Sequence, residues 1–323
     1  MNMTQILTAA LSAMLVFASP TTARVSVNSD GKEKKEANIT RNTAPGIPQS
    51  VIFAGEKTDL TLQDRRERMD REILSFCYSH INTILQIKRA NRLFPIVEPI
   101  LAKHGIPEDF KYLMIIECNG DIEACSTAGA AGPWQFLEKT GRQYGLEING
   151  EVDERYNIEK ATVAACRYLK ESYDEYGDWL TVAASYNTGR TNVTKRIEAQ
   201  KEKKAIDLVL LPETSRYIFR LLAVKTVFSN PQAYGFELKA QDLYPTIPIA
   251  KTININKPVN SWASVAKKHG LTYLQLHEAN PWIRSASMTN KQGKLYKVKI
   301  PSVESLRYDP KKTKAHDRRW VTE

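Results

Sequence analysis

The chain lacks the features that would place it within a membrane. No uninterrupted apolar run reaches the roughly 18 to 20 residues that a membrane-spanning helix requires, and the longest apolar-rich stretch lies at the extreme N-terminus. No cysteine occurs among the first 76 residues, so a lipid carried on an N-terminal cysteine has no attachment point. The sequence also shows no internal repeat. We therefore expect neither an integral membrane protein nor a lipid-anchored one.

Charge and composition limit the remaining classes. The first 23 residues carry no charged side chain, so the formal net charge of +10, from 46 Lys and Arg against 36 Asp and Glu, belongs to the rest of the chain. Apolar residues make up 42 % of the 323 positions, and 5 Trp, 14 Tyr and 9 Phe supply enough apolar surface for a sizeable core. This composition excludes a mainly disordered chain. The length predicts about two domains.

The N-terminal stretch resembles an export signal. Residues 6–18 form an apolar run with the length of a signal-peptide core, and small residues follow as far as Ala23. We interpret residues 1–23 as a signal peptide, which predicts a protein of the periplasm or cell envelope and is compatible with peripheral association with a membrane. Because no Lys or Arg precedes the run and the cleavage site reads Thr-x-Ala, a buried N-terminal helix stays open as the alternative. The polar residues 24–59 are typical of a disordered linker.

The chain contains four cysteines: Cys77, Cys118, Cys125 and Cys166. An even number in an exported protein is compatible with disulfides, and four cysteines allow three pairings. Cys118 and Cys125 are close enough in sequence to close a short loop. The spacing does not resemble a zinc site, and we expect no metal. One disulfide and four buried free thiols both stay open.

The apolar pattern divides the chain into a helical part and a smaller segment. Helices are predicted at residues 66–87, 93–104, 158–176, 180–187 and 214–230, with one more beginning at 106–109. We predict an all-α domain over residues 60–240.

Beyond a proline-rich passage the pattern changes. A strand at 252–255, helices at 262–269 and 273–280, and a strand at 295–300 predict a small βααβ domain over residues 250–302. A basic tail, residues 303–323, closes the chain. The predicted fold class is therefore mainly α.

Glu117 is the first candidate for chemistry. It is the only carboxylate in the apolar helical run 110–118, and Asn119-Gly-Asp121 ends the helix directly after it. Apolar neighbours and the negative end of the helix dipole both disfavour the charged carboxylate, so the pKa of Glu117 should be raised. A carboxylic acid that stays protonated near neutral pH is what a general acid needs. Taken alone, a glutamate at this spacing is more often a surface residue at a helix end.

Three further motifs combine aromatic and polar side chains. A run of small residues at 128–132 precedes Trp134 and Gln135, Tyr186 and Asn187 lie within residues 185–189, and Tyr217 ends residues 213–217. Sugar rings have apolar faces edged by hydroxyl groups, so stacking on Trp134 and hydrogen bonding to Gln135 would suit a glycan. Each motif alone is more ordinary as a helix boundary.

Together the four motifs resemble the catalytic domain of the soluble lytic transglycosylase family, relatives of goose-type lysozyme. Upstream, residues 85–91 and 105–113 look most like the membrane-bound lytic murein transglycosylase D subgroup. The resemblance implies a lysozyme-like all-α domain with Glu117 as catalytic acid and base. The implied substrate-binding residues are Cys118, Trp134, Gln135, Tyr186, Asn187 and Tyr217.

Two positions depart from this family's pattern. Cys118 stands where the family usually has serine, which replaces a hydroxyl by a weaker hydrogen-bonding thiol. Pro133 stands where leucine or methionine is common. Neither change removes the acid, so the rate is affected more than the reaction.

The C-terminal segment resembles a LysM module, a βααβ fold that binds glycans containing N-acetylglucosamine. Residues 261–270, Asn280 and residues 297–301 carry the resemblance. Residues 258–261 read Pro-Val-Asn-Ser where the family usually has Pro-Gly-Asp-Thr, which affects a loop of the sugar groove. A small cap packed on the catalytic domain stays open as the alternative.

The resemblance implies a peptidoglycan lytic transglycosylase that needs no cofactor. It would cleave the β-1,4 bond between N-acetylmuramic acid and N-acetylglucosamine and leave a 1,6-anhydro ring, with Glu117 acting twice. The nearest other acids, Asp121 and Glu123, are expected to be exposed, so a two-carboxylate scheme lacks its second group. A hydrolytic muramidase and a non-catalytic peptidoglycan-binding scaffold are the alternatives.

The positive charge suits an anionic cell wall. The expected partner is the peptidoglycan glycan strand. A nucleic-acid-binding protein would also be basic, but the export signal and the four motifs argue against it, so we expect no nucleic acid as partner.

Overall fold

The computed structural model describes residues 43–322. The predicted signal peptide and residues 24–42 of the expected linker lie outside the described residues. Within the described part, no helix is long and apolar enough to cross a membrane.

A β-hairpin opens the described chain. Strands β1 (Ser50–Phe53) and β2 (Glu56–Asp59) pair antiparallel. The prediction of a disordered linker over residues 24–59 is therefore wrong for the hairpin. Phe53 is fully buried, and its ring packs edge-on against Phe110 with centroids 5.5 Å apart, so this short segment belongs to the core.

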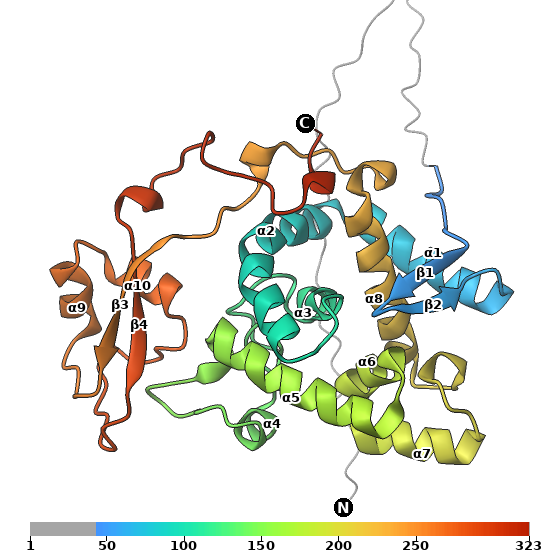
Figure 1. The fold of residues 1–323 in the computed structure, drawn as a ribbon, viewed down its shortest axis with the longest axis horizontal. Coiled ribbons are helices and arrows are strands. Elements are labelled where there is room, and N and C mark those ends of the chain that lie inside the picture. Colours follow the sequence, from blue (N-terminus) through green and yellow to red (C-terminus); the bar gives the residue numbers. More distant parts are fainter. Residues whose placement is uncertain (1–42, 323) are drawn as a thin grey trace, which may run out of the picture. The chain divides into compact units, whose positions relative to one another are not determined.

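The helical part confirms the mainly α fold (Figure 1). Its helices are α1 (Gln63–Tyr78), α2 (His80–Lys103), α3 (Phe110–Cys118), α4 (Glu138–Gln143), α5 (Ile158–Tyr176), α6 (Trp179–Thr188), α7 (Arg190–Gln200) and α8 (Pro212–Ser229). Short 3-10 turns lie at Glu154–Tyr156, Ala205–Asp207, Pro231–Tyr234, Ala240–Asp242, Glu304–Leu306 and Arg318–Trp320.

The helix boundaries show where the apolar pattern was informative. Helix α5 has the predicted bounds, because a long amphipathic run begins after the N-cap Asn157, whose side chain accepts from Lys160 N, and ends at Gly177 in the left-handed region. The single helix expected over residues 66–87 is divided at Ser79, whose backbone leaves the helical region. The short helix α4 and the polar helix α7 were not predicted, because neither has a continuous apolar stripe.

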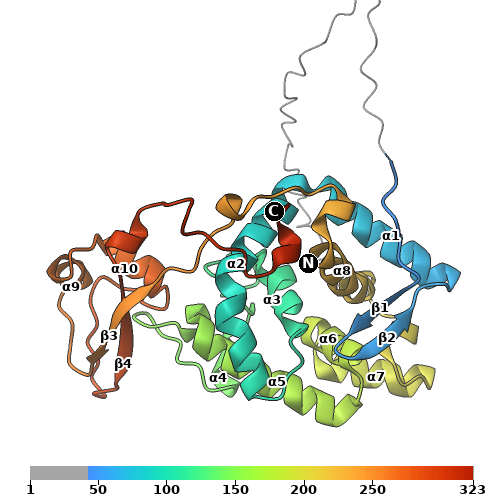
Figure 2. The same ribbon diagram turned by 45° about the horizontal axis from the view of Figure 1, so that its top comes forward.

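Helix α3 occupies the middle of the helical part, packed against α2 and α8 (Figures 1 and 2). Its apolar residues from Phe110 to Ile115 are buried. Lys111, also buried, is neutralised by Glu98 at 2.7 Å. Nearly all of α3 is buried. Glu117, the polar residue near its end, therefore lies next to α8 at the edge of an apolar region.

The C-terminal segment has the predicted βααβ order. Strand β3 (Ile249–Ile255), helices α9 (Trp262–Lys268) and α10 (Tyr273–Ala279), and strand β4 (Tyr296–Pro301) form it, with β3 and β4 antiparallel. The segment has its own core, in which Trp262, Leu276, Trp282 and Val298 are buried.

One residue of the helical part contributes to this second core. Val152, 1 % exposed, packs among the buried residues of the βααβ segment and forms a β-bridge with Ile283. Beside it, the carbonyl of Glu151 accepts from Arg284 N at 2.9 Å, and the Glu151 carboxylate accepts from Thr289 N at 3.0 Å. The segment therefore packs on the helical domain, in the way that a cap would.

The basic tail returns to the helical domain. Trp320 is 1 % exposed, its indole N–H donates to the carbonyl of Phe228 at 3.0 Å, and its ring lies 5.7 Å from those of Phe94 and Phe228. Residues 303–323 are basic in composition. The buried side chain of Trp320 nevertheless holds the end of this segment against the helical domain.

Candidate active site

Glu117 lies in the last turn of α3. The helix ends at Cys118, and Asn119 follows in the left-handed region with φ 52°. The Glu117 side chain is partly buried, and its Oε1 accepts a hydrogen bond from the hydroxyl of Tyr217 on α8. Tyr217 is only 3 % exposed. The buried phenol of Tyr217 therefore orients the carboxyl group of Glu117. The family resemblance had implied that Tyr217 contacts the glycan.

The surroundings of Glu117 favour its protonated form. Burial raises the pKa of Glu117 to about 7, and the negative charge of Glu213 acts in the same direction. The hydrogen bond from Tyr217 and the positive charge of Arg220 both lower this pKa, but by less than burial raises it. The expectation of a raised pKa is thus met, and the group can give and take a proton near neutral pH.

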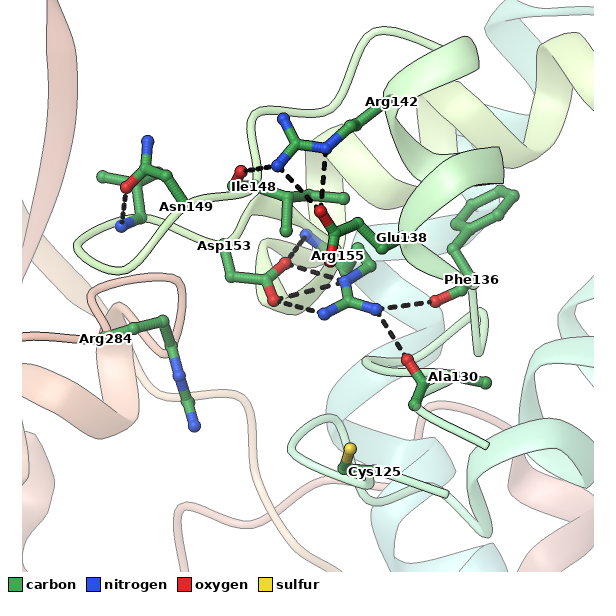
Figure 3. Close-up of polar contacts among 12 residues, drawn as sticks. Cys125, Ala130, Phe136, Glu138, Arg142, Ile148, Asn149, Asp153, Arg155 and Arg284 are labelled. Carbon is green, nitrogen blue, oxygen red and sulfur yellow. Dashed lines mark hydrogen bonds and ion pairs between the residues drawn. The ribbon is translucent and has the colours of Figure 1, made fainter. Parts of the chain in front are cut away.

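The loop of small residues after α3 is held by a buried arginine. Arg155 Nη1 donates to the carbonyl of Gly129 at 2.8 Å and to that of Phe136 at 3.1 Å. Asp153 forms an ion pair with the same guanidinium, and its Oδ2 lies 2.7 Å from Arg155 Nη2 (Figure 3). This pair is nearly enclosed and fixes both ends of the loop, which makes it a supporting element that the sequence did not reveal.

Gly132 is required by the close approach of two backbone segments. Its φ is +79°, and a Cβ built on it would lie 1.9 Å from the carbonyl oxygen of Arg155. No other residue fits at this position without moving the loop.

Gln135 follows in the same loop, with φ +46°. Its side-chain nitrogen donates to the carbonyls of Ala124 at 3.0 Å and Gly132 at 2.9 Å. The amide group therefore closes the loop on itself. Gln135 is half-buried, and its contact with a glycan stays a prediction.

Two predicted glycan contacts are corrected by their burial. Trp134 is fully buried, and its indole N–H donates to Thr162 Oγ1 at 2.9 Å, so its ring has no open face on which a sugar could stack. Cys118 is 2 % exposed, and its thiol donates to the carbonyl of Met114 at 3.2 Å. Both side chains belong to the packing beneath the site.

Tyr186 and Asn187 lie at the end of α6 and are half-buried. The Tyr186 hydroxyl donates to the carbonyl of Trp134 at 2.6 Å, which joins α6 to the loop after α3. Burial raises the pKa of Tyr186 well above its usual value, and the charge of Glu117 adds to this rise, so the phenol stays protonated close to the acid. The structure thus brings Glu117, Tyr217 and Tyr186 together. The role of Asn187 stays a prediction.

The two acids that follow α3 in the chain face solvent. Asp121 and Glu123 are exposed, as expected, and lie 3.8 Å from Arg89 and 3.7 Å from Arg284, respectively. Glu213 is the acid that acts electrostatically on Glu117, and it was not singled out from the sequence. Its place as the first residue of the fourth motif was the available signal.

The four cysteines are free thiols. Cys77, Cys118 and Cys166 are buried and Cys125 is exposed, and none of them is in a disulfide in this structure. Across residues 43–322, no group of three or more His, Cys, Asp or Glu side chains is arranged to hold a metal ion.

Comparison with known proteins agrees with this architecture. Residues 96–209 match the family described as the transglycosylase SLT domain, and residues 251–304 match the soluble lytic transglycosylase C-terminal LysM-like domain. Two curated relatives, both called membrane-bound lytic murein transglycosylase D, come from Escherichia coli strain K12 and Escherichia coli O6:H1. Each is 28 % identical over 244 residues, which cover 73 % of this chain and 52 % of the relative.

The chain thus spans about half the length of the curated relatives it matches. The first family match contains Glu117 and the second contains the βααβ segment. The chain therefore carries a transglycosylase SLT domain followed by a C-terminal LysM-like domain, and it is a distant homologue of membrane-bound lytic murein transglycosylase D.

Proposed function

We propose that the protein is a peptidoglycan lytic transglycosylase in which Glu117 is the only catalytic acid and base. The SLT domain supports the reaction class and the substrate. The observation that carries the proposal is the setting of Glu117: a carboxyl group with a pKa of about 7, partly buried at the end of the apolar helix α3 and oriented by Tyr217. Such a group can act first as an acid and then as a base in one catalytic cycle.

The reaction then needs no water. Protonated Glu117 gives its proton to the glycosidic oxygen as the bond to C1 of N-acetylmuramic acid breaks. The C6 hydroxyl oxygen of the same sugar bonds to C1, and its proton passes to the Glu117 carboxylate. The products are a free 4-hydroxyl group on N-acetylglucosamine and a 1,6-anhydromuramoyl end, and Glu117 is again protonated for the next cycle.

The neighbouring residues divide into two roles. Tyr217 and the backbone around Trp134 hold the acid and the loop in place. Gln135, Tyr186 and Asn187 are half-buried beside them, and we assign them to glycan binding. The Gln135 nitrogen and the Tyr186 hydroxyl already donate within the protein, so the Asn187 amide and the side-chain carbonyl of Gln135 would contact the sugar hydroxyl and acetamido groups.

A hydrolytic muramidase is the second candidate, and Glu213 is the observation in its favour. Glu213 is a second carboxylate close enough to raise the pKa of Glu117. A hydrolase requires such a group to activate water or to stabilise the cation. Glu213 is exposed, however, and we assign it an electrostatic effect only.

The domain limits and the location of the protein follow from the same proposal. We assign residues 60–240, together with the hairpin before them, to catalysis, and residues 250–302 to glycan binding. Export to the periplasm or cell envelope would place the enzyme at its substrate. A small cap without its own ligand remains the alternative for the LysM-like domain, and the contacts of Glu151 and Val152 with it suit that role.

Mass spectrometry of the soluble products tests the proposal. Purified protein comprising residues 24–323 is incubated with peptidoglycan, with Glu117→Gln as the matched control. Anhydromuropeptides should appear with the wild-type protein and fall by at least about 100-fold in the variant. Products heavier by one water would identify a muramidase. Retained binding to sacculi without any product would identify a scaffold.

A further inference from the structure

Glu72 on α1 is a carboxylate that the proposed mechanism does not use. It is 0 % exposed and pairs with arginines of α8. Helix α8 packs against α1 (Figure 1). Its Oε1 accepts from Arg216 Nε at 2.9 Å and from Arg71 Nε at 3.1 Å. Its Oε2 receives no hydrogen bond from the described residues, and Arg220 Nε lies 3.6 Å from it.

The two arginines from α8 flank the residue that orients the acid. Arg216 and Arg220 are four residues apart and therefore lie on one face of the helix. Tyr217, which donates a hydrogen bond to Glu117, follows Arg216 directly in the chain. Arg220 is also the cation whose charge reaches Glu117. One helix therefore carries both the hydrogen bond and the positive charge that act on the acid.

We propose that Glu72 is a positioning residue for the acid: it holds Arg220 on the α1 side of α8 and offsets the positive charge that Arg220 directs at Glu117. The Glu117 carboxyl is then close to an arginine, Arg220, whose position is fixed and whose charge is partly neutralised by Glu72. The catalytic meaning of this arrangement rests on the proposed transglycosylase activity, but the electrostatic connection between Glu72 and Glu117 does not.

The other groups that act on Glu117 are few among the described residues. Tyr217 and Glu213 act from α8, Tyr186 lies close on α6, and Cys118 is its neighbour on α3. Among the described residues that act on Glu117, Arg220 also pairs with Glu72, so the two opposite charges act on Glu117 as a partly neutralised pair. The alternative is that Glu72 only joins α1 to α8. In that case its replacement would change stability and leave the pKa of Glu117 unchanged.

Titration of the Glu117 carboxyl carbon by ¹³C NMR, assigned from its absence in Glu117→Gln, tests the proposal. Glu72→Gln leaves the charge of Arg220 unbalanced, so the pKa of Glu117 should fall by about half a unit. Arg220→Gln removes that charge, so the pKa should rise by about the same amount. Arg65→Gln is the matched control, because Arg65 is an arginine of α1 that pairs with Asp207 and not with Glu72, and it should leave the titration unchanged.

The alkaline limb of the pH–rate profile for anhydromuropeptide release should move in the same directions. If the wild-type protein releases no such product, the proposed function fails while the NMR titration still decides the role of Glu72. Unshifted titrations in folded Glu72→Gln and Arg220→Gln would overturn the inference.

Arg216→Gln provides a second route if Glu72→Gln does not fold. Arg216 is a partly exposed side chain, and its removal leaves the Glu72 charge free to offset Arg220 more fully. The pKa of Glu117 should then rise, and an unchanged value would also overturn the inference.

Discussion

The hydroxyl of Tyr217 donates a hydrogen bond to Glu117 Oε1, although 100 positions separate the two residues in the chain. Tyr217→Phe removes this bond without changing the shape of the core. Because the bond lowers the pKa of Glu117, its loss should raise that pKa, and the alkaline limb of the activity should move to higher pH. We expect the maximal rate to fall about tenfold, since the carboxyl loses its orientation.

Initial rates of anhydromuropeptide release measured across pH check this prediction. Tyr176→Phe is a suitable control, because that hydroxyl bonds Arg190 and Thr194 on another part of the helical domain. An unchanged limb in Tyr217→Phe would mean that the tyrosine only fills space.

The raised pKa of Glu117 also predicts a pH-dependent stability. The carboxyl has a pKa of about 7 in the folded protein against 4.5 when exposed, so between these values the folded state binds more protons than the unfolded state. Stability from this group therefore decreases as the pH rises from about 4.5 to about 7, and the full penalty applies above pH 7. Glu117→Gln, which cannot ionise, should melt at a higher temperature than the wild type at pH 8.

At pH 4 the two proteins should melt at nearly the same temperature, because Glu117 of the wild type is then mainly protonated in the folded and in the unfolded state. Thermal unfolding followed by circular dichroism at the two pH values makes the comparison. Equal differences at pH 4 and pH 8 would contradict a buried, neutral Glu117.

Gly132→Ala should disrupt the loop beside the acid. The added methyl group would lie 1.9 Å from the carbonyl oxygen of Arg155, so the loop must move away from its support. Gly129→Ala is the matched control: Gly129 has the same φ of +79° but nothing within 4 Å of its Cβ position. Gly129→Ala should cost only the backbone strain of about 1–2 kcal/mol.

We expect Gly132→Ala to lose clearly more stability and activity than Gly129→Ala. Urea denaturation and the rate of product release measure the two effects. Similar losses in both variants would show that backbone conformation alone makes glycine necessary in this loop.

Trp320 should matter for stability and not for chemistry. Replacement by alanine removes a buried indole and its hydrogen bond to Phe228, which predicts a loss of about 3–5 kcal/mol in the free energy of unfolding. Tyr308→Ala, in the same C-terminal segment but 71 % exposed, should stay within about 0.5 kcal/mol of the wild type. Equilibrium denaturation of both variants checks the difference.

Long periodic patterns predicted the fold, and short or distant relationships escaped prediction. Helix α5 was predicted because its amphipathic pattern runs over 19 residues, and the βααβ order because two alternating runs flank two helical ones. The hairpin at residues 50–59 was missed because its short strands follow a polar stretch, and the packing of Phe53 on Phe110 is a contact between distant parts of the chain.

The site shows the same division. Glu117 stood out because a lone carboxylate in an apolar run is unusual. Trp134 was misjudged because sequence does not distinguish an aromatic ring that faces solvent from one that packs inward against Thr162. Glu72 and Arg220 were missed because their relation to Glu117 depends on how α1 and α8 pack, which local patterns do not contain.

Val152 gives the LysM-like segment a dependence on its host. The side chain belongs in sequence to the helical domain but fills part of the hydrophobic core of the βααβ segment. Excised alone, residues 250–302 would have a hole where that valine packs, and a small domain has little stability to spare. In the whole protein the two parts should therefore unfold together in one cooperative transition, so the LysM-like segment behaves as an integral part of the fold and not as an independent module.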